Sequence, residues 1–269
     1  MKELFGRDKA IVAMIHVGAL PGTPRSGTDV GRLCQQAARE AELYTRAGVD
    51  GLMIENMHDV PYLCEQVGPE IVASMTAVGL AVRAASDRPL GVQVLAAANR
   101  EALAVAQACG AAFVRVENFA YAHVADEGLM ATAQAGPLLR YRRQIGAQHV
   151  RIIADVKKKH SSHAITADVD LVEAARTAEF CGAEGIVVTG SATGRPTDPD
   201  ELRAVRSAVG VPVWVGSGVT PDNLPLLWPH ADVLIVGSYF KREGRWFNEP
   251  DARRVERLLA AAAELGHQK

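Results

Sequence analysis

Eight short apolar runs, rich in Val, Ile and Met, constrain the fold of this chain more than any other feature. They recur at intervals of roughly thirty residues, and Ala-rich stretches with helical periodicity separate them, so strands and helices alternate. Eight parallel strands within about 250 residues match an α/β fold of the (β/α)8, or TIM, barrel type. The predicted strands are residues 11–17, 51–56, 90–95, 113–118, 150–157, 185–189, 212–216 and 233–237.

A doubly wound sheet is the main alternative for such an alternation, and the turn after the first strand argues against it. Doubly wound sheets that bind dinucleotides carry G-x-G-x-x-G at that turn, whereas residues 16–22 read HVGALPG. We therefore predict one barrel domain over residues 1–269. Two long connections, 21–30 and 119–136, follow the ends of predicted strands, where barrels build their sites.

The charge composition excludes several classes of protein. Lys and Arg total 29 against 31 Asp and Glu, scattered along the chain, so nucleic acid is not an expected partner. The start, MKELFGRDKA, carries charges where a secretory leader needs an apolar core, and the longest apolar run, 71–82, is too short to span a bilayer. The four cysteines lack C-x-x-C spacing, which favours a reducing compartment. We expect a cytoplasmic homo-oligomer without a membrane segment.

Strand alternation predicts which side chains face the barrel interior. The face turned toward the helices must be apolar, so the residues that alternate with it point inward. In the predicted fifth strand, Ile152, Ala154 and Val156 suit the helices, which turns Asp155 and Lys157 inward. The same parity applied to six neighbouring strands gives an inward polar set of His16, Glu55, Gln93, Arg115, Glu117, Asp155, Lys157 and Thr189.

These polar residues lie toward the strand C-termini, which is where barrels carry their active sites. An interior ion-pair network that only holds the strands in register is the alternative, but such networks are weak evidence for stability. Close carboxylates and cations push one another's proton affinities apart, as acid/base chemistry requires. We predict catalytic roles for His16, Glu55, Arg115, Glu117, Asp155 and Lys157, and substrate contacts for Gln93, Thr189 and Gly190.

Two small-residue turns follow the last two predicted strands and predict a phosphate site. Glycine lets the backbone approach a ligand closely, and amide groups at such turns point at an anion. Phosphate sites after strands seven and eight are common in barrels. Tight turns that merely favour Gly and Ser are the alternative. The predicted phosphate-binding residues are Gly216, Ser217, Gly218, Gly237 and Ser238.

Three weaker possibilities remain open from the residues alone. A divalent metal held by Glu55, Glu117 and Asp155 would serve the same electrostatic purpose, although nothing fixes a ligand geometry. A lysine that forms a Schiff base is a second possibility, but the sixth strand ends in Thr189. Residues 189–196, which contain two glycines, are a candidate for a substrate-covering loop.

Four segments carry a resemblance to a known family: IHVGALPGTP at 15–24, GLMIEN at 51–56, ADVKKKH at 154–160 and VGSGV at 215–219. Together they resemble the BtpA/SgcQ family over nearly the whole chain. The resemblance implies a barrel-like fold. It also implies two kinds of role, because the family is named for the accumulation of photosystem I in cyanobacteria, while other members accompany sugar uptake and carbohydrate-phosphate functions.

The residues and the resemblance together give one function and one alternative. We expect an enzyme that acts on a small phosphorylated sugar or nucleotide-derived sugar by isomerase- or lyase-type proton transfer. Asp155 or Glu117 would be the general base, Lys157 and Arg115 would stabilise negative charge, and Glu55 or His16 would return the proton. The alternative is a non-catalytic assembly or regulatory factor, as in photosystem I biogenesis, that keeps a phosphate-binding barrel.

Overall fold

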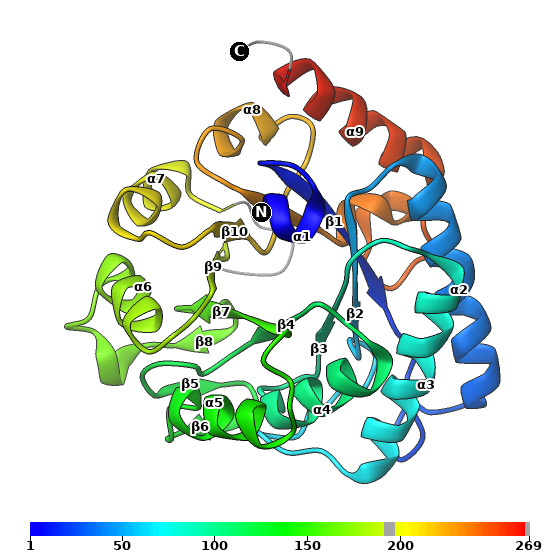
Figure 1. The fold of residues 1–269 in the computed structure, drawn as a ribbon, viewed down its shortest axis with the longest axis horizontal. Helices are drawn as coiled ribbons and strands as arrows, with labels where there is room; N and C mark the ends of the chain where they lie inside the picture. Colours follow the sequence, from blue (N-terminus) through cyan, green and yellow to red (C-terminus); the bar gives the residue numbers. More distant parts are fainter. Residues whose placement is uncertain (191–196, 267–269) are drawn as a thin grey trace.

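The barrel strands are parallel and close in the order β1-β11-β10-β9-β7-β4-β3-β2 (Figure 1). This computed structural model describes residues 1–190 and 197–266. Every barrel strand falls on a predicted run, so the (β/α)8 barrel inferred from the sequence is confirmed. The strands are β1 (Ala10–His16), β2 (Gly51–Glu55), β3 (Leu90–Gln93), β4 (Phe113–Val116), β7 (Arg151–Val156), β9 (Gly185–Val188), β10 (Val213–Val215) and β11 (Val233–Val236).

Helices surround the barrel, and their ends follow local sequence signals. In α2, the Asp29 carboxylate accepts a hydrogen bond from the Arg32 amide at 3.0 Å, and Gly48 ends the helix at a φ of 97°. Among the described helices, none is long and apolar enough to cross a membrane. They are α1 (Lys2–Phe5), α2 (Val30–Ala47), α3 (Pro69–Ala85), α4 (Asn99–Cys109), α5 (Ala135–Gln144), α6 (Leu171–Phe180), α7 (Pro199–Ala208), α8 (Leu224–Leu227) and α9 (Ala252–Gly266), with short 3-10 turns η1 (Ala164–Thr166), η2 (Ser238–Phe240) and η3 (Arg242–Gly244).

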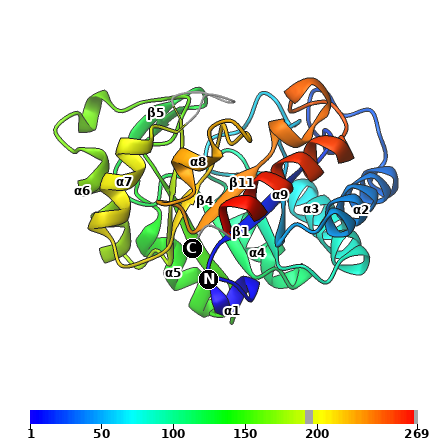
Figure 2. The same cartoon turned by 90° about the horizontal axis from the view of Figure 1, so that it is seen from above.

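A small antiparallel sheet is added to the barrel. It consists of β6 (Gly128–Met130), β5 (His123–Ala125) and β8 (Ser161–Ser162), in that order. The hairpin of β5 and β6 lies within the long connection predicted at 119–136. Figure 2 shows β5 and α1 at opposite ends of the barrel. Of the predicted substrate-covering loop, residues 191–196 lie outside the described residues.

The interior of the barrel at the α1 end is filled by large apolar side chains. The centroids of the Phe113 and Trp214 rings lie 5.2 Å apart. The ring of Phe5 in α1 packs against both of them at this end of the barrel. A glycine on the strand next to each ring leaves room for it: Gly91 on β3 beside Phe113 of β4, and Gly185 on β9 beside Trp214 of β10. A Cβ at Gly91 would lie 2.1 Å from the Phe113 ring, and one at Gly185 would lie 2.9 Å from Trp214 Nε1. This end of the barrel is therefore a packed core.

The predicted strand parity holds through the barrel. Ile11, Leu52 and Val114 belong to the buried layer between strands and helices. Val12 and Met53, one position on, belong to the separate cluster inside the barrel. Because side chains alternate along a strand, the inward positions beyond these apolar residues face the far end of the barrel, opposite α1.

Candidate functional site

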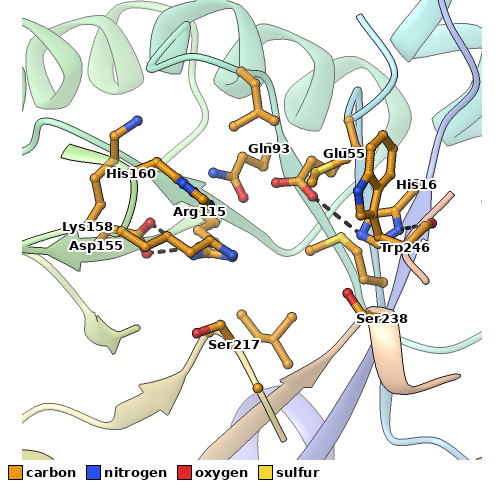
Figure 3. A pocket seen from close by; sticks show the side chains of 18 of the residues that line it. His16, Glu55, Gln93, Arg115, Asp155, Lys158, His160, Ser217, Ser238 and Trp246 are labelled. Carbon is orange, nitrogen blue, oxygen red and sulfur yellow. Dashed lines mark hydrogen bonds and ion pairs between the residues drawn. The ribbon is translucent and has the colours of Figure 1, made fainter. Parts of the chain in front are cut away.

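A cavity of about 240 Å³ lies at the carboxyl ends of the barrel strands. Barrels of this type place their active sites at this end, because several loops converge there. Figure 3 shows Gln93 and Glu55 on one side of the cavity and Ser217 and Ser238 on the other. Most of the predicted site residues line it together: His16, Glu55, Gln93, Arg115, Glu117, Asp155, Gly216, Ser217, Gly218, Gly237 and Ser238.

Thr189 and Gly190, which we expected to contact substrate, support the wall of the cavity instead of lining it. The Thr189 hydroxyl accepts a hydrogen bond from the Lys159 amide at 3.1 Å. The Gly190 amide donates to Ser217 Oγ at 2.8 Å. The end of β9 therefore positions residues from its two neighbours, β7 and β10.

Lys157 lies elsewhere than strand parity predicted. β7 ends at Val156, and Lys157 adopts a φ of 43°, so the alternation of the strand stops one residue before it. Its Nζ donates to the carbonyl of Thr166 at 3.3 Å, and it lines a second, smaller cavity. The next two residues, Lys158 and Lys159, face the main cavity in its place. Strand parity predicted Lys157 at the cavity, whereas the two lysines that follow it line the cavity instead.

Arg115 and Asp155 form a bidentate ion pair at the centre of the site. Arg115 Nε and Nη2 donate to the two Asp155 carboxylate oxygens at 2.9 and 3.0 Å, and both side chains are more than 90% buried. Burial opposes the Arg115 charge, but the Asp155 carboxylate outweighs it and raises the pKa of Arg115, so the guanidinium stays charged. Gly216 leaves space for it, because a Cβ there would lie 2.9 Å from Nη2.

Glu117 is held by a second set of contacts. Its Oε2 accepts hydrogen bonds from Lys158 Nζ at 3.2 Å and from the Ala97 amide at 2.9 Å. Asn99, at the start of α4, bonds to both the amide and the carbonyl of Glu117, at 3.2 and 2.7 Å. The carboxylate and its backbone are therefore both fixed in position.

His16 and Glu55 lie opposite each other in the pairing of β1 with β2. His16 Nε2 is 3.7 Å from Glu55 Oε2, and Nδ1 is 3.0 Å from the Trp246 carbonyl (Figure 3). A carbonyl only accepts, so Nδ1 carries the hydrogen and Nε2 is the acceptor that faces Glu55. Burial, assisted by Lys241, lowers the pKa of His16 to about 3, and the ring is neutral at pH 7. Burial raises the pKa of Glu55 against the opposing charge of Arg115.

The two predicted phosphate turns lie side by side where β10 and β11 end. Gly218 has a φ of 68°, a conformation that favours glycine. The amides of Gly218, Val219 and Ser238 donate to no partner within the described part of the chain. Arg254 of α9 also lines the cavity, and its guanidinium stacks 4.4 Å from the centre of the Tyr239 ring. Free amides, hydroxyls and an arginine together form an anion-binding surface.

Several lining residues escaped the sequence analysis, notably Lys158, Lys159, Trp246 and Arg254. Lys158 and Lys159 belong to a basic run whose direction depends on where β7 ends. Trp246 lies in the connection after β11, and Arg254 lies on a helix otherwise defined by its apolar face. Neither has a periodic signal that would mark it as part of the site.

Two of the three carboxylates considered for a divalent metal are committed to other partners. Asp155 binds Arg115, and Glu117 binds Lys158. Among residues 1–190 and 197–266, no group of three or more His, Cys, Asp or Glu side chains is arranged to hold a metal ion. The residues present therefore do not fit the metal site considered from the sequence.

Comparison with solved structures shows the same fold in several barrel enzymes. A mutant tryptophan synthase alpha-subunit from Pyrococcus furiosus matches with a TM-score of 0.61 at 15% identity, over 94% of this chain and 99% of that one. Thiamine phosphate pyrophosphorylase from Pyrococcus furiosus matches at 0.58 and 16%, over 96% of each chain. Phosphoribosyl anthranilate isomerase from Thermus thermophilus matches at 0.57 and 13%, over 95% of this chain and 99% of that one. At these identities the likeness concerns the fold alone.

Comparison with known sequences finds relatives at higher identity. An uncharacterized mitochondrial protein of Caenorhabditis elegans is 43% identical, over 96% of this chain and 95% of its own. The photosystem I biogenesis protein BtpA of Synechocystis is 33% identical, over 97% of this chain and 91% of its own. The model of the BtpA family matches residues 7–264. The resemblance seen in the sequence motifs is thus confirmed, and the chain belongs to the BtpA family.

Proposed function

We propose that this protein is an enzyme that binds a small phosphorylated sugar or nucleotide-derived sugar and catalyses proton transfer of the isomerase or lyase kind. One observation carries the proposal. A single cavity has an anion-binding surface on one side, around Ser217, Gly218 and Ser238, and buried acid/base groups on the other. A substrate anchored by its phosphate would present its remaining atoms to those groups.

The proposed phosphate site consists of hydrogen-bond donors, in the turns after β10 and β11, whose backbone amides have no partner within the described residues. The amides of Gly218, Val219 and Ser238, the hydroxyl of Ser238 and the Arg254 guanidinium converge there. The last two strands are also where many barrels hold phosphate. Two structures of the same fold, a thiamine phosphate pyrophosphorylase and a phosphoribosyl anthranilate isomerase, are named for phosphorylated compounds.

The reacting end rests on Glu55, Arg115 and Gln93. Burial raises the pKa of Glu55 above its ordinary value, which suits a carboxyl group in an acid/base role. Arg115 is charged and buried, so it stabilises a developing oxyanion strongly. Gln93 Oε1 is buried with no hydrogen-bond partner in the described residues, and in the complex it accepts from a substrate hydroxyl.

The contacts also revise the roles assigned from the sequence. Asp155 holds Arg115 in place, and Glu117 holds Lys158, so Glu55 takes the acid/base role in preference to either. Lys158 takes the electrostatic role given to Lys157. With a pKa of about 3, His16 is neutral, and its Nε2 faces the Glu55 carboxyl group at 3.7 Å.

The alternative, a non-catalytic assembly factor, draws on a different observation. The Synechocystis relative, at 33% identity, is named for photosystem I biogenesis. Against this role stands the burial of Arg115, Asp155, Glu55 and Glu117, because even buried ion pairs can often be replaced by apolar residues without loss of stability. A scaffold has no need of these charges. The enzyme remains the better-supported function.

The test is the thermal stabilisation of the purified protein by phosphorylated pentoses, hexoses and nucleotides. A ligand that binds only the folded state adds about 2.7 kcal/mol to the free energy of unfolding at a concentration one hundred times its Kd. The melting temperature rises as a result. We expect stabilisation by at least one phosphate ester and none by its unphosphorylated counterpart. The stabilising compound then serves as the substrate for isomerase and lyase assays.

A matched pair of variants locates the binding. Ser217→Asp places a negative charge beside the anion-binding surface and should abolish the stabilisation. Ser207→Asp introduces the same charge at an exposed position on α7 and should leave it unchanged. Absence of stabilisation by every phosphate ester would count against the enzyme and favour the assembly factor.

A further inference from the structure

Lys159 occupies a distinctive place among the lysines of the site. It follows the end of β7, lines the main cavity and is half-buried. Its backbone amide donates to the Thr189 hydroxyl at 3.1 Å, which ties its main chain to the end of β9. Arg115, Glu55, Asp155 and Glu117 all act on its charge, so its amine lies among the central groups of the cavity.

The amine of Lys159 is nevertheless unpaired. Within the described residues it forms no salt bridge and no hydrogen bond, and two of the surrounding carboxylates are engaged elsewhere: Asp155 with Arg115 and Glu117 with Lys158. Lys158, by contrast, is buried in direct contact with Glu117.

The surroundings also favour the neutral amine. Burial lowers the pKa of Lys159, the nearby Arg115 lowers it further, and the carboxylates offset this only in part. An unpaired amine with a lowered pKa, in a cavity lined by charged groups, is the arrangement that favours a nucleophilic lysine.

We infer that Lys159 Nζ is a nucleophile that forms an imine with a carbonyl group of the substrate. The inference deepens the proposed function, on which it rests, by assigning a carbonyl to the phosphorylated substrate. It also places the reactive amine two residues after the predicted inward Lys157, in the segment that follows β7, whereas the Thr189 that spoke against a Schiff base in the sequence follows β9.

The step balances without any further reactant. The amine lone pair forms a bond to the carbonyl carbon, and the C=O π electrons move to oxygen. Glu55, with its raised pKa, carries a proton from nitrogen to oxygen, and the resulting hydroxyl leaves as water on further protonation. The product is a protonated imine, whose positive nitrogen withdraws electrons from an adjacent C–H or C–C bond. Addition of water in the reverse sequence releases the product and restores the amine.

The experiment uses pyridoxal 5'-phosphate as a probe, because it is an aldehyde that carries a phosphate and forms imines with lysine. The full-length protein is treated with a limiting amount of the probe, reduced with sodium borohydride, and digested for peptide mass spectrometry. We expect Lys159 to be labelled in preference to Lys157 and the exposed Lys2, since a lower pKa leaves more of the amine neutral and reactive.

Two variants separate reactivity from folding. Lys159→Arg keeps the positive charge but cannot form an imine, and it should lose the label at this site. Lys157→Met removes the neighbouring lysine outside the main cavity and should leave the labelling of Lys159 intact. Preferential labelling of Lys158, or equal labelling of exposed lysines, would overturn the inference.

A comparison with unphosphorylated pyridoxal distinguishes this inference from the proposed function. Selective labelling by the phosphorylated probe, suppressed by inorganic phosphate, supports both. Equal labelling of Lys159 by both aldehydes supports the nucleophile and removes the phosphate anchor. Stabilisation of the protein by pyridoxal 5'-phosphate without a label on Lys159 supports the phosphate site and overturns the nucleophile.

Discussion

The two halves of the barrel interior are built from the same strands and have opposite chemistry. On β4, inward Phe113 is followed two residues later by Arg115, and on β7 Ile153 is followed by Asp155. On β10, Trp214 is followed by Gly216, which leaves space for the Arg115 guanidinium. One step of strand alternation, about 6.6 Å along the chain axis, therefore separates an apolar core from a charged cavity.

This difference indicates which half of the barrel interior supplies stability. The lower half, near α1, removes large aromatic surfaces from water. The upper half buries ions whose desolvation offsets most of their mutual attraction. In the proposed function, the charges there serve binding and chemistry rather than stability. Mutations in the two halves should consequently behave differently.

The largest effect is expected in the lower half. Phe113→Ala removes a ring that contacts both Trp214 and Phe5, and the rigid barrel cannot collapse into the space. We expect the free energy of unfolding to fall by about 3–5 kcal/mol. Denaturant titration measures it, and the phosphate ester that stabilises the wild type should still bind the folded variant.

Phe180→Ala is the matched control, since Phe180 is 90% exposed at the end of α6. Its stability should stay within about 0.5 kcal/mol of the wild type. If Phe113→Ala cost no more than Phe180→Ala, the lower half would not be the stabilising core described here.

In the upper half, the buried pair of Arg115 and Asp155 should show strong coupling. Arg115→Met leaves the Asp155 carboxylate without its bidentate partner and should lower stability by about 3 kcal/mol. In a protein that already carries Asp155→Asn, Arg115→Met should lower the free energy of unfolding by much less. A double-mutant cycle measured by denaturant titration should give a coupling energy on the order of 2 kcal/mol.

The cycle also sharpens the contrast with the lower half. The double variant should regain most of its stability and yet lose the stabilisation by phosphate esters that the wild type shows, because the charge that faces the substrate is gone. Retained ligand binding in the double variant would show that the pair only holds the strands together.

Much of this arrangement could be predicted from the sequence because it follows from alternation. The eight apolar runs gave the barrel, and parity along β2, β3 and β4 placed Glu55, Gln93, Arg115 and Glu117 on the inward face. Such positions depend on local geometry that repeats every two residues. The prediction stopped being valid at Lys157, where a left-handed backbone conformation ends the alternation after β7.

The rest depended on contacts between distant parts of the chain. Trp246 reaches the cavity through its carbonyl, which bonds to His16, 230 residues earlier. Arg254 reaches it by stacking on Tyr239. Neither contact has a local sequence pattern, since any residue can supply a carbonyl and an arginine on an amphipathic helix normally faces solvent. Residues of this kind are found only once the fold brings them together.

The most specific effect concerns pH, because the two halves should differ in the slope of stability against pH. The folded-state pKa of His16 is about 3, below its unfolded value near 6.5, so between these values the unfolded chain binds the extra proton. Stability from this group is complete above pH 6.5 and falls as pH decreases toward 3, by at most about 1.4 kcal/mol per pH unit.

His16→Gln should flatten that part of the profile measured by denaturant titration at each pH. Phe113→Ala should lower the whole profile without changing its slope, because no titrating group is lost. A wild-type slope that survived in His16→Gln would assign the pH dependence to other groups and leave His16 outside the contrast between the two halves.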